Sequence, residues 1–294
     1  MRSILMVVFI LFCFVSFSQS IQIVDKKDNT PVPYATVLLI NQNKIVGGNY
    51  CNQDGFLNID NSVVFDKAEL SCVGYETKVL EKLELNSKII FLENKVMPLQ
   101  EIVISNKSAV PVVFGYTSLQ KKQLSGIGKG LETVVFIENT TGLPLFVQSF
   151  LFKVGEVKKR AALRIHFYKK QLGIFEPGEE ILTDDLIEYL SEKTKGLVEI
   201  NIAKHRVELP EEGFFVGIES LGVFDESTNN FKDSKNIFDN LFVEYNTKLD
   251  NSLTFSRNRF KNKSWIDFNE WLRSLGLNSS KNLNLSFGIK ASAN

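Results

Sequence analysis

Short apolar segments separated by turn-forming residues recur along most of this chain, and this spacing most limits the fold it can adopt. Residues 35–40 are mostly apolar on both faces. In 163–168, apolar residues on one face alternate with Arg164, His166 and Tyr168 on the other. Such runs, bounded by Gly, Pro, Asn and Asp, are typical of β-strands rather than of helices. The sequence therefore predicts an all-β chain built from β-sandwiches.

The chain, with 294 residues, is long enough for two domains that each have a core. Residues 21–105 contain about seven expected strands, the number found in a small sandwich. Residues 131–294 contain about eight or more, which predicts a second, jelly-roll-like β-sandwich. Residues 106–130 are expected to be an irregular linker, because their glycines lack the spacing of a dinucleotide-binding loop.

The charge balance argues against one class of partner. The chain has 34 Lys and Arg and 34 Asp and Glu, and the two signs are mixed along the sequence. This mixture does not build the positive field that nucleic-acid binding requires. We therefore expect no nucleic-acid partner.

Residues 1–20 are interpreted as a signal peptide. Arg2 gives a positive start, residues 4–15 are apolar, and residues 16–18 (Ser-Phe-Ser) have the small-x-small pattern of a cleavage site. The apolar run is shorter than the roughly 20 residues that a membrane helix needs. A short membrane anchor is the alternative. We expect export, with no transmembrane span in the mature chain.

Two cysteines, Cys51 and Cys72, remain after such a cleavage. An exported chain can pair them in a disulfide. They can equally be two small buried side chains on neighbouring strands. The sequence does not fix the Cα separation that a disulfide needs, so both interpretations stay open.

Four short motifs in the first region carry a resemblance to a known family. They are Pro-Val-Pro-Tyr-Ala-Thr-Val at 31–37, Asp-Gly-Phe at 54–56, Val-Gly-Tyr-Glu-Thr at 73–77 and Leu-Gln-Glu-Ile-Val-Ile at 99–104. With these motifs, residues 21–105 resemble the carboxypeptidase regulatory-like domain. The resemblance implies a transthyretin-like β-sandwich in an exported protein of the Bacteroidetes group. It also implies an accessory module rather than a peptidase, and the residues after 105 are too few for the transporter barrel that often follows this domain.

The sequence contains two candidate sets of metal ligands, and both are incomplete. His205 and Glu208 match the His-x-x-Glu pair of zinc carboxypeptidases, but no His follows to complete the three protein ligands of a catalytic zinc site. The loop with Asp225, Asn229 and Asp233 lacks the dense oxygen ligands and central Gly of a calcium loop. We expect these residues to be solvated surface groups, and we expect no metal and no cofactor.

No catalytic set is expected either. Nucleophilic catalysis requires a His near the nucleophile, and both His166 and His205 lie on predicted strands with polar, exposed neighbours. The adjacent carboxylates Asp184 and Asp185 are expected to be solvated. A hydrolase with distant carboxylates is the least favoured alternative.

Trp265 and Trp271 flank a polar segment and are the candidate ligand contacts. Exposed aromatic rings stack on sugars, so a carbohydrate-binding module is the alternative function, although packing is the commoner fate of Trp in sandwiches. The sequence predicts an exported, non-enzymatic accessory protein of the cell envelope. We expect it in the periplasm or associated with the outer membrane or cell surface, where edge strands and loops bind a protein or glycan.

Overall fold

The computed structural model describes residues 21–60, 62–96, 110–119, 122–232, 240–274, 276–277 and 281–293. Four sequence-based interpretations lie outside these residues. They are the signal peptide at 1–20, the strand at 101–105, the start of the linker at 106–109 and the calcium-loop candidate Asp233.

The first domain consists of two small sheets that face each other. Sheet I has the order β4-β1-β7, and sheet II has the order β3-β2-β5-β6. The bounds are β1 (Ile21–Asp25), β2 (Thr36–Asn41), β3 (Lys44–Tyr50), β4 (Phe56–Leu57), β5 (Lys67–Ser71), β6 (Lys78–Glu81), the 3-10 helix η1 (Lys82–Asn86) and β7 (Ile89–Leu92). Alternate residues of both sheets, such as Ile23, Val37 and Leu70, form one buried core. The predicted sandwich of the first region is therefore present.

The second domain consists of two larger sheets. Sheet III has the order β13-β12-β17-β10-β20-β21, with β14 paired to β12 and β18 paired to β17. Its strands are β10 (Leu131–Ile137), β12 (Ala161–Lys170), β13 (Pro177–Glu180), β14 (Ile187–Leu190), β17 (Phe214–Asp225), β18 (Asn230–Lys232), β20 (Thr254–Asn258) and β21 (Ile266–Asp267).

Sheet IV has the order β22-β19-β11-β23-β8, with β15 and β16 paired to β11 and β9 paired to β19. Its strands are β8 (Val112–Gly115), β9 (Lys122–Ile127), β11 (Leu145–Val157), β15 (Gly196–Asn201), β16 (Glu208–Leu209), β19 (Leu241–Asn246), β22 (Asn284–Leu285) and β23 (Phe287–Ser292). Helix α2 (Phe268–Ser274) and the 3-10 helix η2 (Ala203–His205) lie between strands. The prediction of an all-β, sandwich-like chain is confirmed.

Phenylalanine fills the core of the second sandwich. Phe150, Phe152 and Phe287 of sheet IV meet Phe167 and Phe214 of sheet III, and all five are fully buried. Their rings lie mainly edge to face, and the centroids of these edge-to-face pairs are 5.3 to 6.3 Å apart. This packing explains why the chain is rich in Phe.

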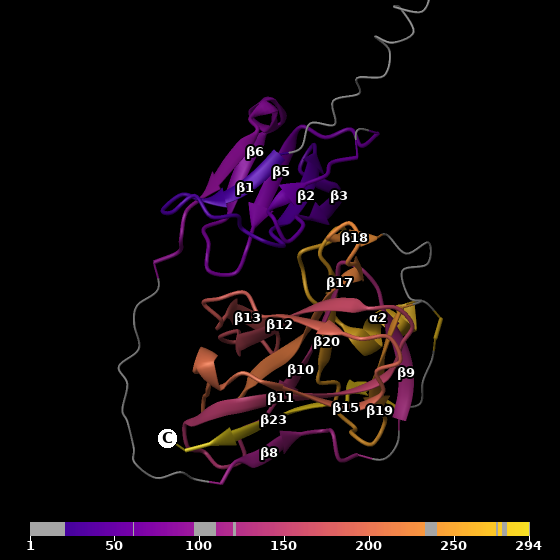
Figure 1. Cartoon of the computed structure of the whole chain (residues 1–294). Helices are drawn as coiled ribbons and strands as arrows, with labels where there is room; N and C mark the ends of the chain where they lie inside the picture. The colour runs from indigo at the N-terminus through magenta and orange to yellow at the C-terminus, as the bar shows by residue number, and fades with distance from the viewer. Residues whose placement is uncertain are drawn as a thin grey trace, which may run out of the picture.

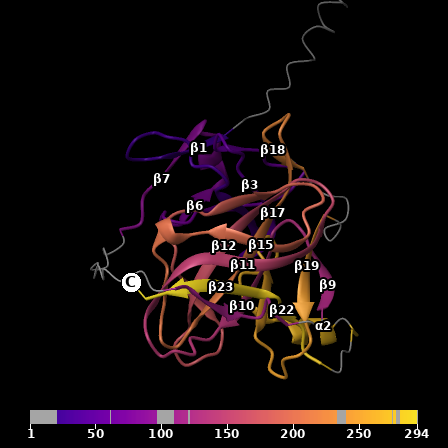
Figure 2. The same ribbon diagram turned by 60° about the horizontal axis from the view of Figure 1, so that its bottom comes forward.

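The first sandwich lies above the second in Figure 1, and β17 and β18 of sheet III lie on the side of the second sandwich that faces the first. Tyr34 and Tyr50 of the first domain are buried against Leu221, Phe224 and Phe231 of the second. Figures 1 and 2 both place β18 next to the first domain. The outer face of sheet III is therefore covered in part by the first domain, and in part by Phe175 and Trp265 of the second domain itself.

The prediction that residues 106–130 are only an irregular linker is wrong. β8 and β9 lie inside it and belong to sheet IV, where β8 pairs with β23 and β9 pairs with β19. Each is short, and β9 contains Gly126, so neither shows enough apolar alternation to be separated from a loop. The second sandwich begins at β8.

Within the described residues, no helix combines the length and the apolar character that crossing a membrane requires.

Candidate functional site

A row of charged residues crosses four neighbouring strands on the outer face of sheet III. Arg164 of β12 lies opposite Glu219 of β17, Glu219 lies opposite Glu132 of β10, and Glu132 lies opposite Arg257 of β20. Directly opposite residues on one face are about 5 Å apart, so their charges interact. Both glutamates are completely buried, and Arg164 is 2% exposed. We call this row, with His166, Tyr168, Glu180, Asp185 and Arg259, the charge cluster.

Arg164 joins the cluster to the first domain. Its Nε and Nη2 donate to the two carboxylate oxygens of Asp185 at 2.6 and 3.0 Å, and its Nη1 donates to Glu219 Oε2 at 3.0 Å. The same guanidinium donates to the Tyr34 carbonyl at 2.6 Å and to Thr36 Oγ1 at 3.3 Å. Tyr50 donates its hydroxyl hydrogen to Glu219 Oε1 at 2.7 Å. The cluster therefore stands in the interface between the domains.

His166 lies between carboxylates on both sides of its ring. Its Nδ1 is 2.6 Å from Glu180 Oε2, and its Nε2 is 3.1 Å from Glu219 Oε2 and 3.9 Å from Glu132 Oε1. Burial alone would lower the pKa of His166, but the charges of Glu132 and Glu180 and its hydrogen bonds raise that pKa to about 10. Both ring nitrogens then donate, so His166 is an imidazolium ion at neutral pH.

Glu132 and Glu219 are ionised although they are buried. Burial would raise the pKa of Glu219, but the charges of Arg164, Arg259 and His166 hold that pKa well below its usual value. Arg257 donates to Glu132 Oε2 at 2.8 Å, and Tyr168 donates to Glu132 Oε1 at 2.5 Å. Within the cluster, the three guanidinium groups and the imidazolium balance the four carboxylates.

The ligand atoms of Glu132, His166 and Glu219 lie within 4.8 Å of one another, which makes this the candidate metal centre of the described residues. A metal ion would have to displace a proton from His166 and add positive charge beside three guanidinium groups. The donor set therefore fits an ion-pair network better than it fits a metal.

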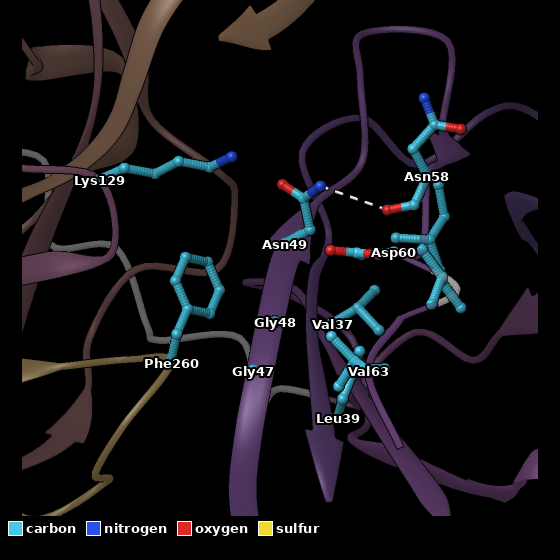
Figure 3. A pocket seen from close by; sticks show the side chains of 12 residues that line it. Val37, Leu39, Gly47, Gly48, Asn49, Asn58, Asp60, Val63, Lys129 and Phe260 are labelled. Carbon is cyan, nitrogen blue, oxygen red and sulfur yellow. Dashed lines mark hydrogen bonds between the residues drawn. The ribbon is translucent and has the colours of Figure 1, made fainter. Parts of the chain in front are cut away.

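A groove of about 360 Å³ lies at the edge of the same interface (Figure 3). Val37 and Leu39 form its apolar floor, reached past the bare backbone of Gly47 and Gly48 on β3. Figure 3 shows Lys129 and Phe260 of the second domain on one side of β3, across from Asp60 of the first. A shallow hollow of about 370 Å³ continues along β3 past Phe260, to Val46 and Lys261. We call the two together the interdomain groove.

Phe260 anchors the groove. Its ring packs so closely on Gly48 of β3 and on Gly130 before β10 that a Cβ on either glycine would collide with it. Gly130 also has φ of +78°, a conformation that favours glycine. The two glycines therefore let one aromatic ring fit between the domains and fix the width of the groove.

The two tryptophans predicted as ligand contacts are half-buried and lie in different surroundings. Trp265 lies under the Arg257 guanidinium, 4.1 Å from its ring centroid, and edge-on to Tyr168. Trp271 of α2 packs on the main core and against Phe268, with ring centroids 5.7 Å apart. The structure does not bring them together, and the aromatic side chain that lines the groove is Phe260.

The weak metal candidates take part in local structure. His205 ends η2 and Arg206 has φ of +50°, so His205 does not lie on the strand predicted around it, and β16 begins only at Glu208. Asp225 accepts hydrogen bonds from Ser227 and Thr228 in its own turn.

Two predictions of solvated groups were wrong. His166 is buried together with its neighbours Arg164 and Tyr168, which were expected to be exposed, and Asp185 accepts two of the hydrogen bonds that Arg164 donates. Asp185 is held by Arg164, which also reaches Tyr34 of the first domain, whereas His166 is enclosed by Glu132, Glu180 and Glu219 from other strands of its own domain. The alternation that placed Arg164, His166 and Tyr168 on one face was correct, and an Arg-x-His-x-Tyr pattern inside an otherwise apolar strand was the signal for the cluster.

Cys51 and Cys72 are free thiols. Cys51 donates its backbone N–H to Ala35 on one side of β2, and Cys72 follows Ser71, which pairs with Thr36 on the other side. They are thus two strand spacings apart, about 9 to 10 Å, beyond the reach of a disulfide. Burial raises the pKa of both thiols, and nearby Asp185 raises that of Cys72 further, which is the opposite of what a nucleophilic cysteine needs.

No family model matches this chain, and no curated protein matches it. Among solved structures, it is similar to the cysteine protease and lectin-like domains of Cwp84, a surface layer associated protein of Clostridium difficile, with 9% sequence identity and a TM-score of 0.36. That similarity covers 94% of this chain and 63% of the other, so the chain spans slightly less than two thirds of that structure's length. A second structure, clostridial Cwp84 after propeptide cleavage, has 11% identity and a TM-score of 0.36, with 94% and 70% covered.

One prediction is corrected at this point. The prediction that the chain has no enzymatic activity is not kept, although the similar structures, which include a cysteine protease, are too distant to assign an activity to this chain. That prediction also rested on the expectation that no cluster of reactive groups is present, and the charge cluster removes this ground. We therefore do not classify the chain as non-enzymatic, and at this identity and TM-score we transfer neither the protease nor the lectin activity to it.

Proposed function

We propose that this chain is an exported binding protein of the bacterial cell envelope, and that it holds a partner protein or a glycan in the interdomain groove. The observation that carries the proposal is that both domains build this groove. Asn49 and Asp60 come from the first domain, and Lys129 and Phe260 come from the second. An apolar floor with a few polar groups at the rim is the usual composition of a binding site.

The proposed compartment, periplasmic or at the cell surface, is supported by the sequence. Residues 1–20 have the charge, apolar run and small residues of a signal peptide. The motifs of residues 21–105 resemble those of an accessory domain in exported Bacteroidetes proteins. Its sandwich in this chain contributes one wall of the groove, which is consistent with a domain that helps to bind a partner.

Gly47 offers a way to fill the groove. A Cβ on Gly47 would meet only Val63 Cγ1, at 3.9 Å, so the change Gly47→Leu places a side chain in the groove without a backbone clash. Lys88→Leu is the matched control, because Lys88 is exposed and does not line the groove.

The experiment measures binding of the purified mature chain to a glycan array and to proteins of the native envelope fraction. We expect Gly47→Leu to weaken the interactions of the wild type at least tenfold and Lys88→Leu to leave them unchanged, with equal thermal midpoints for all three proteins. Interactions that Gly47→Leu leaves at full strength would show that the groove is not the binding site.

A further inference from the structure

Strand β3 forms one end of sheet II, and in the described part of the chain no strand pairs with its outer edge. An exposed edge offers backbone N–H and C=O groups to an added strand. Residues 45–49 of this edge line both parts of the interdomain groove. The groove therefore runs along an open strand edge.

The pairing pattern shows which residue of β3 points its backbone outward. Cys51 N–H donates to the Ala35 carbonyl at 2.9 Å, so the backbone of Cys51 faces β2. Hydrogen-bonded and non-bonded pairs alternate along an antiparallel ladder, so Asn49 faces β2, whereas Tyr50 and Gly48 face the open edge. Tyr50 N–H is bonded by the Asn49 side chain at 2.9 Å. Gly48 thus presents its backbone groups to the groove.

The edge of β3 is also easy to approach. Gly47 and Gly48 carry no side chains, and the Phe260 ring packs on the face of the sheet at Gly48 rather than along its edge. Close approach of a second backbone is the usual reason for glycine inside a strand. The site therefore suits an extended main chain better than a bulky ring.

The charge in the hollow has one sign, whereas Asp60 lines the other part of the groove. Lys129 and Lys261 line the hollow beside Val46, and none of the described residues that line it is acidic. Rim charges of one sign select partners of the other sign. An extended segment in the hollow would place its outward side chains beside these ammonium groups, which favours Asp and Glu.

We propose that the occupant of the interdomain groove is an extended, acidic segment of a partner protein, which adds a strand to the edge of β3 at Gly48. This inference rests on the proposed function and specifies its ligand. Strand addition supplies affinity through main-chain hydrogen bonds, and the lysines supply the preference for acidic side chains.

The test uses arrays of eight-residue peptides in which Val or Thr alternates with acidic, neutral or basic residues, and the purified mature chain as the analyte. We expect the acidic set to bind best. Lys261→Glu should weaken the best peptide at least tenfold by fluorescence anisotropy, whereas the control Lys88→Glu, a charge reversal at an exposed site outside the groove, should not.

Backbone N-methylation then separates strand addition from simple charge attraction. Two peptides are compared, one N-methylated at its odd-numbered amides and one at its even-numbered amides. We expect one of them to lose binding and the other to keep it, because the amides of only one edge of the peptide face β3. Equal losses of binding for the two N-methylated peptides, or equal binding of the acidic, neutral and basic peptide sets, would overturn the inference. If the peptides do not bind but glycans do, and Gly47→Leu blocks the glycans, the proposed function stands and this inference fails. If neither peptides nor glycans bind, both fail.

Discussion

Replacing His166 by glutamine is expected to remove a pH-dependent part of the stability. The pKa of His166 in the folded chain is about 10, above the value of 6.5 for an unperturbed histidine. Between these values the folded state binds one more proton than the unfolded state. The stabilisation is therefore complete below pH 6.5 and is lost as the pH rises toward 10. The free energy of unfolding should fall by about 1.4 kcal/mol per pH unit, or about 2.5 kcal/mol from pH 7 to pH 9.

The assay is urea unfolding at pH 7, 8 and 9, for the wild type, His166→Gln and His205→Gln. Burial raises the pKa values of the cysteines, which therefore contribute equally to the dependence of the free energy of unfolding on pH in all three proteins. Differences in this dependence between the proteins then come from the histidines. Burial and Lys204 lower the pKa of His205, so that residue is neutral in both states above pH 7 and its variant should keep the wild-type slope. If His166→Gln and the wild type show the same slope, His166 is not an imidazolium ion in the folded chain.

Three further predictions test the interface, the cysteines and the packing inside sheet III. Arg164→Met should lower the free energy of unfolding by about 3 to 5 kcal/mol, because it removes the cation of the half-buried Asp185 and one of the cations around the buried Glu219; a loss below about 1 kcal/mol in urea titrations would contradict this. Both cysteines should stay reduced in oxidised glutathione and resist alkylation until the chain unfolds, and an intact mass lower by two hydrogens without denaturant would show a disulfide. Gly217→Ala should lower the free energy of unfolding by more than about 2 kcal/mol, because its Cβ would collide with the Thr133 carbonyl. The control Gly142→Ala, with open space around its Cβ, should lower it by about 1 kcal/mol or less. Equal thermal midpoints of the two variants would refute the close approach at Gly217.

The sequence was sufficient to predict the all-β class and most strands, because strands that bury one face repeat with a period of two residues. It also placed Arg164, His166 and Tyr168 on one face. It did not predict β9, whose Gly126 weakens the apolar pattern, or the turn at Arg206, where a non-glycine residue takes a positive φ.

The candidate site was missed for a physical reason. Alternation shows which residues share a face of a strand, but it does not show what covers that face. Glu132, Glu219 and Arg257 are far apart in the sequence and meet only through the strand order of sheet III. The groove depends in the same way on Gly48 and Phe260, which come from different domains.

A double-mutant cycle on Tyr50 and Glu219 tests most directly whether buried charges hold the two sandwiches together and so maintain the groove between them. Urea unfolding of the wild type, Tyr50→Phe, Glu219→Gln and the double variant gives the coupling energy across the interface. We expect about 1.5 to 3 kcal/mol, the contribution of a buried hydrogen bond to a charged group. A coupling energy indistinguishable from zero would show that Tyr50 and Glu219 do not interact and that the domains do not meet through this cluster.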